Sequence, residues 1–124
     1  MFSINLRDSR PIYEQVKDSL RRAIITGALV TDDKIPSVRE LASELAINPN
    51  TIQKAYRELE SEGYLYSVPG KGSFVSECDE ARKSRKLELF DRLDKTVSEL
   101  THLDVTILEI CSHIQDRAYK EVNR

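Results

Sequence analysis

The sequence predicts a mainly α-helical protein with one small β-hairpin. Through most of the chain, apolar residues recur every three or four positions, which is the spacing of amphipathic helices. Only residues 64–75 change to short β-prone runs around a proline and two glycines, a pattern typical of a hairpin. With 124 residues, of which 40% are hydrophobic and 32% charged, the chain can form one small folded domain and an appendage.

The first helix is predicted to begin at Pro11, because proline lacks the N–H group that would have no partner in a first turn. An apolar stripe follows at four-residue intervals and consists of Ile12, Val16, Leu20 and Ile24. Gly27 is expected to end the helix, and residues 28–36 are predicted to form a loop.

Capping residues predict the next two helices. Ser37 and Glu40 are spaced as a capping box, in which each side chain bonds to a free backbone amide at the helix start. After a short turn, Asn48 is expected to cap a third helix with Pro49 at its first position. Gly63 is expected to end this helix. Two helices joined in this way form a helix-turn-helix arrangement.

The hairpin is predicted where residues 64–68 and 73–75, both β-prone, flank a turn at residues 69–72. A hairpin that directly follows a helix-turn-helix makes a winged helix. We therefore expect a winged helix-turn-helix domain over residues 1–76 and a C-terminal helical tail over residues 77–124.

The tail contains two predicted helices with narrow apolar stripes, the pattern of helices that pack against other helices. The stripes consist of Phe90, Leu93, Val97 and Leu100 in the first helix and Ile107, Ile110 and Ile114 in the second. Two helices of this size bury too little surface to be stable alone. We therefore expect a dimerisation hairpin that holds two copies of the chain together; a hairpin that packs only within one chain is the alternative.

Five short motifs occur in order between residues 10 and 76. They are Ile-Pro-Ser-Val-Arg-Glu-Leu-Ala at 35–42, Asn-Thr-Ile at 50–52, Ala-Tyr-Arg-Glu-Leu-Glu at 55–60, Glu-Gly-Tyr-Leu at 62–65 and Gly-Lys-Gly-Ser-Phe-Val at 70–75. Together they closely resemble the DNA-binding domain of the GntR family of bacterial transcription regulators, and the short tail resembles that of the YtrA-like subfamily. Many relatives carry arginines where this chain has Pro49 and Gln53. The resemblance implies a homodimeric repressor that binds a pseudo-palindromic operator in double-stranded DNA.

This resemblance and the residue chemistry place candidate DNA-binding residues in three segments. Ser37 and Arg39 begin the second helix, where free backbone amides and a guanidinium both attract a phosphate. The start of the third helix, expected in the major groove, carries side chains that can reach base edges or the backbone: Asn48, Asn50, Thr51, Gln53 and Lys54. The wing, expected at the minor groove or DNA backbone, offers Gly70, Lys71 and Gly72. The alternative is that these residues are only helix caps, a solvated helix end and a turn.

Charge does not by itself indicate nucleic-acid binding. Residues 1–76 contain ten Lys or Arg and ten Asp or Glu, whereas nucleic-acid binders are often basic. A winged-helix protein-interaction module without specific DNA binding is therefore the alternative function. The sequence contains no paired nucleophile and base and no phosphate-binding loop, so we expect no enzyme activity.

No cofactor or metal site is expected, because the histidines and cysteines lack the spacing of metal ligands; they are His102, His113, Cys78 and Cys111. No run approaches the roughly 18 apolar residues of a membrane span, so we expect a cytoplasmic protein without a membrane partner. A small-molecule effector that changes the geometry of the dimer is a further hypothesis.

Overall fold

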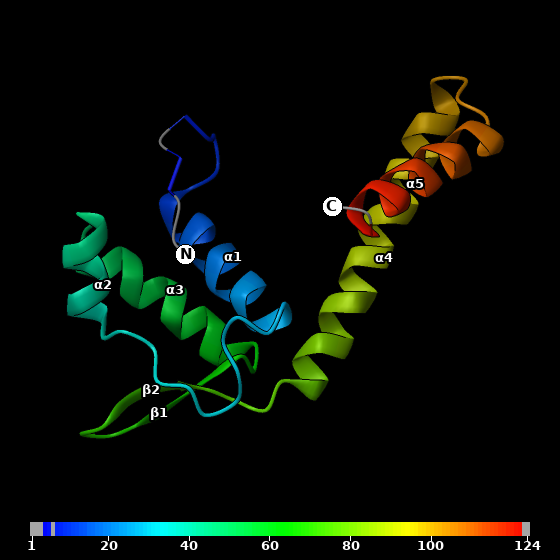
Figure 1. Cartoon of the computed structure of the whole chain (residues 1–124). Helices are drawn as coiled ribbons and strands as arrows, with labels where there is room; N and C mark the ends of the chain where they lie inside the picture. The colour runs from blue at the N-terminus through cyan, green and yellow to red at the C-terminus, as the bar shows by residue number, and fades with distance from the viewer. Residues whose placement is uncertain (1–3, 6, 123–124) are drawn as a thin grey trace. The chain divides into compact units, whose positions relative to one another are not determined.

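The chain divides into two compact units, Met1–Lys83 and Ser84–Arg124, and the computed structural model describes residues 4, 5 and 7–122 of them. The first unit contains, in chain order, α1 (Ile12–Ile25), α2 (Val38–Leu45), α3 (Pro49–Ser61), β1 (Leu65–Val68) and β2 (Gly72–Val75). The helix α4 (Asp79–His102) begins in this unit and continues in the second, which also contains α5 (Ile107–Val122). The predicted class, mainly helical with one antiparallel hairpin, is confirmed (Figure 1).

The central helix of the first unit is α3, which packs against α1, α2 and β1 (Figure 1). Its buried face consists of four residues at the spacing of one helix face: Ile52, Ala55, Tyr56 and Leu59. Val16 and Leu20 of α1 and Leu41 of α2 belong to the same core. Because full burial of an aliphatic side chain contributes about 1.5–3 kcal/mol, this shared core determines which side of α3 stays exposed.

Both predicted N-caps are present. The Oγ of Ser37 accepts a hydrogen bond from the backbone N–H of Glu40 (3.1 Å), and the Oδ1 of Asn48 accepts one from that of Asn50 (2.9 Å). The backbone N–H groups in the first turn of a helix have no acceptor within the helix, and each of these bonds supplies one. Between α2 and α3, Ala46 adopts the left-handed conformation with φ 55°, and this residue forms the turn of the helix-turn-helix.

The segment before α2 is more ordered than the loop predicted for residues 28–36, because its second half pairs with β2. The N–H of Ile35 donates to the carbonyl of Ser73 (3.0 Å), and the N–H of Val75 donates to the carbonyl of Asp33 (2.9 Å). The strand β2 is thus bonded along both edges, to β1 and to this segment. The hairpin therefore projects from a short three-stranded arrangement, which the composition of the loop did not indicate.

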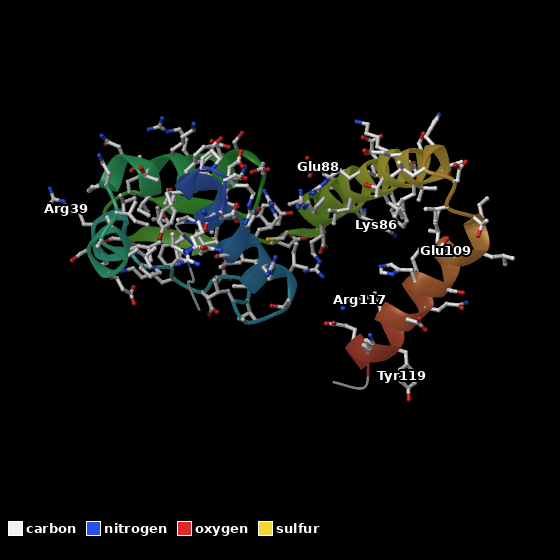
Figure 2. All side chains as sticks on the ribbon, turned by 90° about the horizontal axis from the view of Figure 1, so that it is seen from above. Arg39, Lys86, Glu88, Glu109, Arg117 and Tyr119 are labelled. Atoms are coloured by element: carbon white, nitrogen blue, oxygen red, sulfur yellow. The ribbon has the colours of Figure 1, made fainter. Side chains whose placement is uncertain are left out.

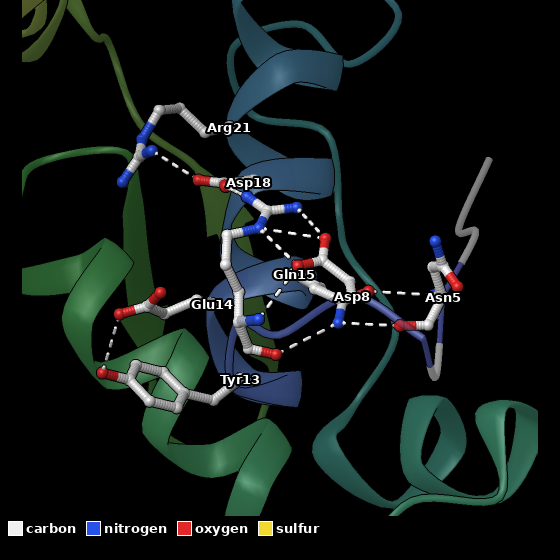
Figure 3. Close-up of polar contacts among 8 residues, drawn as sticks. Asn5, Asp8, Tyr13, Glu14, Gln15, Asp18 and Arg21 are labelled. Atoms are coloured by element: carbon white, nitrogen blue, oxygen red, sulfur yellow. Dashed lines mark hydrogen bonds and ion pairs between the residues drawn. The ribbon is translucent and has the colours of Figure 1, made fainter.

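Gln15 attaches the segment before α1 to the helix (Figure 3). This buried side chain accepts a bond from the N–H of Asn5 (2.9 Å) and donates to the carbonyls of Asn5 (3.0 Å) and Arg10 (3.3 Å). Because the polar atoms of Gln15 are bonded, its burial costs little.

The guanidinium of Arg10 pairs with Asp8 and Asp18, and its hydrogen bonds to Asp8 lower the pKa of the Asp8 carboxyl.

The first turn of α4 packs on the core of the first unit. Ala81 is buried, and its Cβ lies 3.6 Å from the position that a Cβ on Gly63 would occupy. The hydroxyl of Tyr64 donates to the carbonyl of Ala81 (3.4 Å). The guanidinium of Arg82 donates to the carbonyl of Ile25 at the end of α1 (3.2 Å). The compact first unit therefore includes the start of α4.

The second unit leaves its apolar residues largely uncovered. The helices α4 and α5 are joined by a turn at Leu103 and Asp104, after which α5 runs back at an angle to α4 (Figures 1 and 2). None of the described side chains of residues 84–121 is buried. Phe90 is 53% exposed and Ile107 is 71% exposed, although both lie on predicted apolar stripes. None of the helices in the described part of the chain could span a bilayer.

We expect Ala46→Gly to stabilise the protein. A side chain in the left-handed conformation costs about 1–2 kcal/mol, whereas glycine avoids this cost but loses more backbone entropy on folding. The free energy of unfolding should therefore rise by about 0.5–1 kcal/mol, as measured by urea denaturation followed by circular dichroism. The matched control Ser43→Gly, in the exposed interior of α2, should lower it by about 0.5 kcal/mol. Destabilisation by both glycines would contradict the explanation.

Candidate nucleic-acid interface

The predicted site residues lie on neighbouring parts of the first unit: the start of α2, the start of α3 and the tip of the hairpin. An open hollow of about 440 Å³ separates α3 from the hairpin. Gln53 of α3 and the wing residues Gly70, Lys71 and Gly72 line it, so the structure brings these predicted residues together. Val38, in the first turn of α2, lines the edge of the same hollow.

The start of α2 presents a group of hydrogen-bond donors. Arg39 is exposed and points away from the body of the domain (Figure 2). Ser37 accepts its capping bond through the hydroxyl oxygen, so the O–H remains able to donate. The free amides of the first turn add partial positive charge. Tyr56 holds this end of the helix in place, because its hydroxyl donates to the carbonyl of Pro36 (2.7 Å). This arrangement suits a phosphate.

The start of α3 presents side chains that suit base edges. Asn50 and Gln53 are exposed, and their amides can form paired hydrogen bonds with adenine. Asn48 uses its Oδ1 as a helix cap, which leaves its amide N–H groups able to donate. Thr51 is half-buried beside them. These four residues therefore form a polar surface on the first turns of the helix.

Lys54 is held apart from this surface by α1. Its Nζ lies 3.8 Å from the centroid of the Tyr13 ring, which is a cation–π contact. Such a contact contributes about 0.5–1 kcal/mol at an exposed site, and Lys54 would have to give it up to reach a base. Lys54 is absent from the lining of the hollow that includes its neighbour Gln53.

The wing tip depends on two glycines for different reasons. Gly70 (φ 77°) has open space around it, so only its backbone conformation favours glycine. At Gly72 (φ 120°) a Cβ would in addition lie 3.1 Å from the Cε of Lys34, a tight contact with the end of a flexible side chain. The N–H of Lys71 donates to the carbonyl of Val68 (2.9 Å) and closes the turn. The exposed side chain of Lys71 thereby lies at the tip of the hairpin.

The neutral charge of the domain conceals a separation of charges. Lys17 of α1 pairs with Glu58 (3.0 Å) and Glu62 (2.8 Å) of α3, and Arg21 also pairs with Glu62 (3.4 Å). Burial acts to lower the pKa of Lys17, but hydrogen bonds to the two carboxylates outweigh it and raise this pKa overall. Acidic groups of α3 are thus neutralised on the side that faces α1.

The basic residues near the hollow are unpaired. Within residues 4, 5 and 7–122, Arg39, Arg57 and Lys71 form no ion pair. Arg57 was not predicted as a site residue, yet it lines the hollow one helical turn after Gln53. Its spacing of four residues from Gln53 was visible in the sequence, whereas the strand residues Ser67 and Ser73, which also line the hollow, gave no such signal.

A helix-turn-helix with an exposed polar third helix and a hairpin wing defines the winged-helix class of DNA-binding proteins. Within this class, the family model of the bacterial regulatory proteins of the gntR family matches residues 12–75, just over half of the chain. The chain therefore belongs to the GntR family of DNA-binding regulators.

Comparisons with individual proteins agree with this assignment. The chain is 46% identical over 77 residues to the HTH-type transcriptional repressor YtrA of Bacillus subtilis (strain 168), a match that covers 62% of this chain and 59% of YtrA. A crystal structure of a transcriptional antiterminator from Listeria monocytogenes EGD-e is 35% identical, with a TM-score of 0.79 over 95% of this chain and 90% of that one. The DNA-binding domain of AraR, in complex with operator ORE1, is 37% identical, with a TM-score of 0.53 over 61% and 93% of the two chains. In agreement with the prediction from sequence, the family and the relatives YtrA and YhcF of Bacillus subtilis (strain 168) are named as regulators and not as enzymes.

We expect Tyr56→Phe to lower stability and to change its dependence on alkaline pH. Loss of the hydroxyl leaves the Pro36 carbonyl without this partner, at a cost of about 1 kcal/mol. Burial raises the pKa of Tyr56, and the Glu40 and Glu44 carboxylates raise it further. Above about pH 10 the unfolded chain therefore loses this proton before the folded chain does, and stability falls as pH rises. Urea denaturation between about pH 8 and about pH 11 should show a shallower fall for Tyr56→Phe; identical slopes would contradict this assignment.

Proposed function

We propose that this chain is a sequence-specific transcription repressor that binds a pseudo-palindromic operator as a homodimer. The proposal is carried by the exposed polar start of α3 together with the cations Arg39 and Lys71, which form no ion pair in the part of the chain that the structure describes. Phosphate contacts supply most of the affinity for DNA, whereas contacts to base edges supply specificity. The first unit presents both kinds of group. The solved complex of the related AraR domain with its operator supports the same reading.

The proposed contacts divide by chemistry. Asn50 and Gln53 read base edges in the major groove, with Thr51 and Asn48 at the adjoining backbone. Ser37 and Arg39, together with the first amides of α2, bind a phosphate. Lys71 contacts the minor groove or its backbone, and Gly70 and Gly72 permit close approach of the wing. Lys54 takes part only after leaving the ring of Tyr13.

The dimer is proposed from the uncovered apolar faces of the second unit. Phe90, Leu93, Ile107 and Ile114 are between 42% and 71% exposed, while Val97, Leu100 and Ile110 are half-buried. Exposed apolar area of this kind is removed from water when a second copy covers it. A two-fold dimer would also present two α3 helices to half-sites about one helical turn, or roughly 34 Å, apart.

The first experiment measures binding of the full chain to two kinds of DNA. One is labelled DNA from immediately upstream of its gene, and the other is a pool of random-sequence duplexes that is enriched for bound sequences by rounds of selection. Tight, salt-sensitive binding that resists random competitor DNA, with two chains on each selected site, would support the proposal. Footprinting of the selected duplex would then define the operator. Failure to enrich any duplex above random DNA would overturn the proposal and favour a protein-interaction module.

Two substitutions should separate the proposed roles on that operator. Arg39→Ala is expected to weaken binding to matched and scrambled duplexes by similar factors, because a phosphate is present in both. Gln53→Ala is expected to relax the preference for particular base pairs, typically by about 1–3 kcal/mol each. Titrations on a series of single-base operator variants measure both effects. Identical profiles for the two variants would show that the division of roles is wrong.

Leu93→Asp should weaken the proposed dimer, because it would place a charge on the apolar stripe of α4. We expect sedimentation to show a shift toward single chains and operator affinity to fall, while the winged helix stays folded by circular dichroism. The matched control Ser98→Asp places the same charge on the same helix, off the stripe and at an exposed position. A dimer equally affected by both substitutions, or by neither, would argue against this interface.

A further inference from the structure

The hollow between α3 and the hairpin is open and is lined by polar, charged and apolar residues. Residues from both sides line it, including Gln53 and Arg57 of α3, Ser67 and Ser73 on the strands and Lys71 at the wing tip. The sequence singled out the two edges of this hollow, the helix start and the wing tip, but not its interior.

Groove geometry indicates what would occupy the hollow. In the proposed complex, α3 enters the major groove and the wing reaches the adjacent minor groove. Adjacent major and minor grooves are separated by one sugar–phosphate strand. Any protein that places one element in each groove must therefore straddle that strand. The space between α3 and the wing is where the strand has to pass, so this inference rests on the proposed function.

The charges around the hollow agree with an anionic occupant. Arg57 is exposed and forms no ion pair within the described part of the chain. Of the two nearest carboxylates along α3, Glu58 pairs with Lys17 at 3.0 Å, whereas Glu60 lines the hollow and accepts a hydrogen bond from the hydroxyl of Ser67 at 3.2 Å. The charged side chains of the lining are therefore two cations, Arg57 and Lys71, and one carboxylate. The guanidinium is therefore available, and its planar set of donors matches two phosphate oxygens at once.

We propose that the hollow seats the sugar–phosphate strand between the two grooves and that Arg57 binds a phosphate of that strand. Glu60, held by Ser67, closes the far end of the hollow to further phosphates. In this arrangement Arg57 determines how the wing and α3 are positioned on the DNA together. It contributes affinity on every sequence and leaves base reading to Gln53 and Asn50.

The test compares Arg57→Gln and Arg57→Lys with the full-length wild type on the selected operator duplex and on a scrambled duplex of equal length. For Arg57→Gln we expect affinity to fall about tenfold or more on both duplexes. The slope of log affinity against log salt should become shallower by about one per half-site. Ethylation interference should lose one phosphate in each half-site, at the boundary between the two footprinted grooves. Arg57→Lys should retain the salt slope but bind more weakly than wild type.

Arg22→Gln is the matched control, because Arg22 is exposed on α1 and does not line this hollow. It should leave the slope and the interference pattern unchanged. Unchanged slope and interference for Arg57→Gln, with wild-type operator binding intact, would overturn this inference and leave the proposed function standing. Failure of the wild type itself to prefer any duplex would overturn both. Thermal denaturation of each variant checks that these exposed changes leave the fold intact.

Discussion

One face of α3 is buried against α1, α2 and β1, and the arrangement of the first unit follows from that burial. An α-helix turns through 3.6 residues, so once Ile52 and Leu59 face the core, Asn50, Gln53 and Arg57 are left to solvent. The same packing joins α3 to α1, α2 and β1, and therefore sets where the start of α2 and the wing lie. The geometry of the polar site is thus a consequence of apolar contacts on its other side.

Interactions between residues close together in the sequence made most of this fold predictable. Ser37 and Asn48 cap the helices that they were expected to cap, because a cap acts within three residues. The pairing of Ile35 with Ser73 was missed, because Ile35 lies nearly forty residues before Ser73 in a segment that carries no strand pattern of its own. Arg57 was missed as a site residue for a related reason: its position becomes distinctive only after the hairpin folds beside α3.

A count of charged residues along the sequence does not distinguish those that form ion pairs in the folded chain from those that do not. The equal numbers of acidic and basic residues in the first domain favoured a protein-interaction role as the alternative. In the structure, Glu58 and Glu62 pair with Lys17 and Arg21 on the α1 side, while Arg39 and Lys71 form no ion pair with any described residue. The effective charge that a partner meets therefore depends on which face it approaches. Residue type alone also does not show whether a cation is free to bind DNA: the ammonium group of Lys54 contacts an aromatic ring of α1.

In the proposed dimer, the uncovered apolar faces of the tail would make the activity of this protein depend on its abundance. When two chains must meet to cover such a face, the paired form grows with the square of the chain concentration while chains are scarce, and stability cannot be separated from that concentration. A modest rise in synthesis would then produce a disproportionate rise in promoter occupancy. Single chains, with Phe90 and Ile107 open to water, would also be the form most exposed to chaperones and proteases. The response to chain concentration would thereby have a steep threshold.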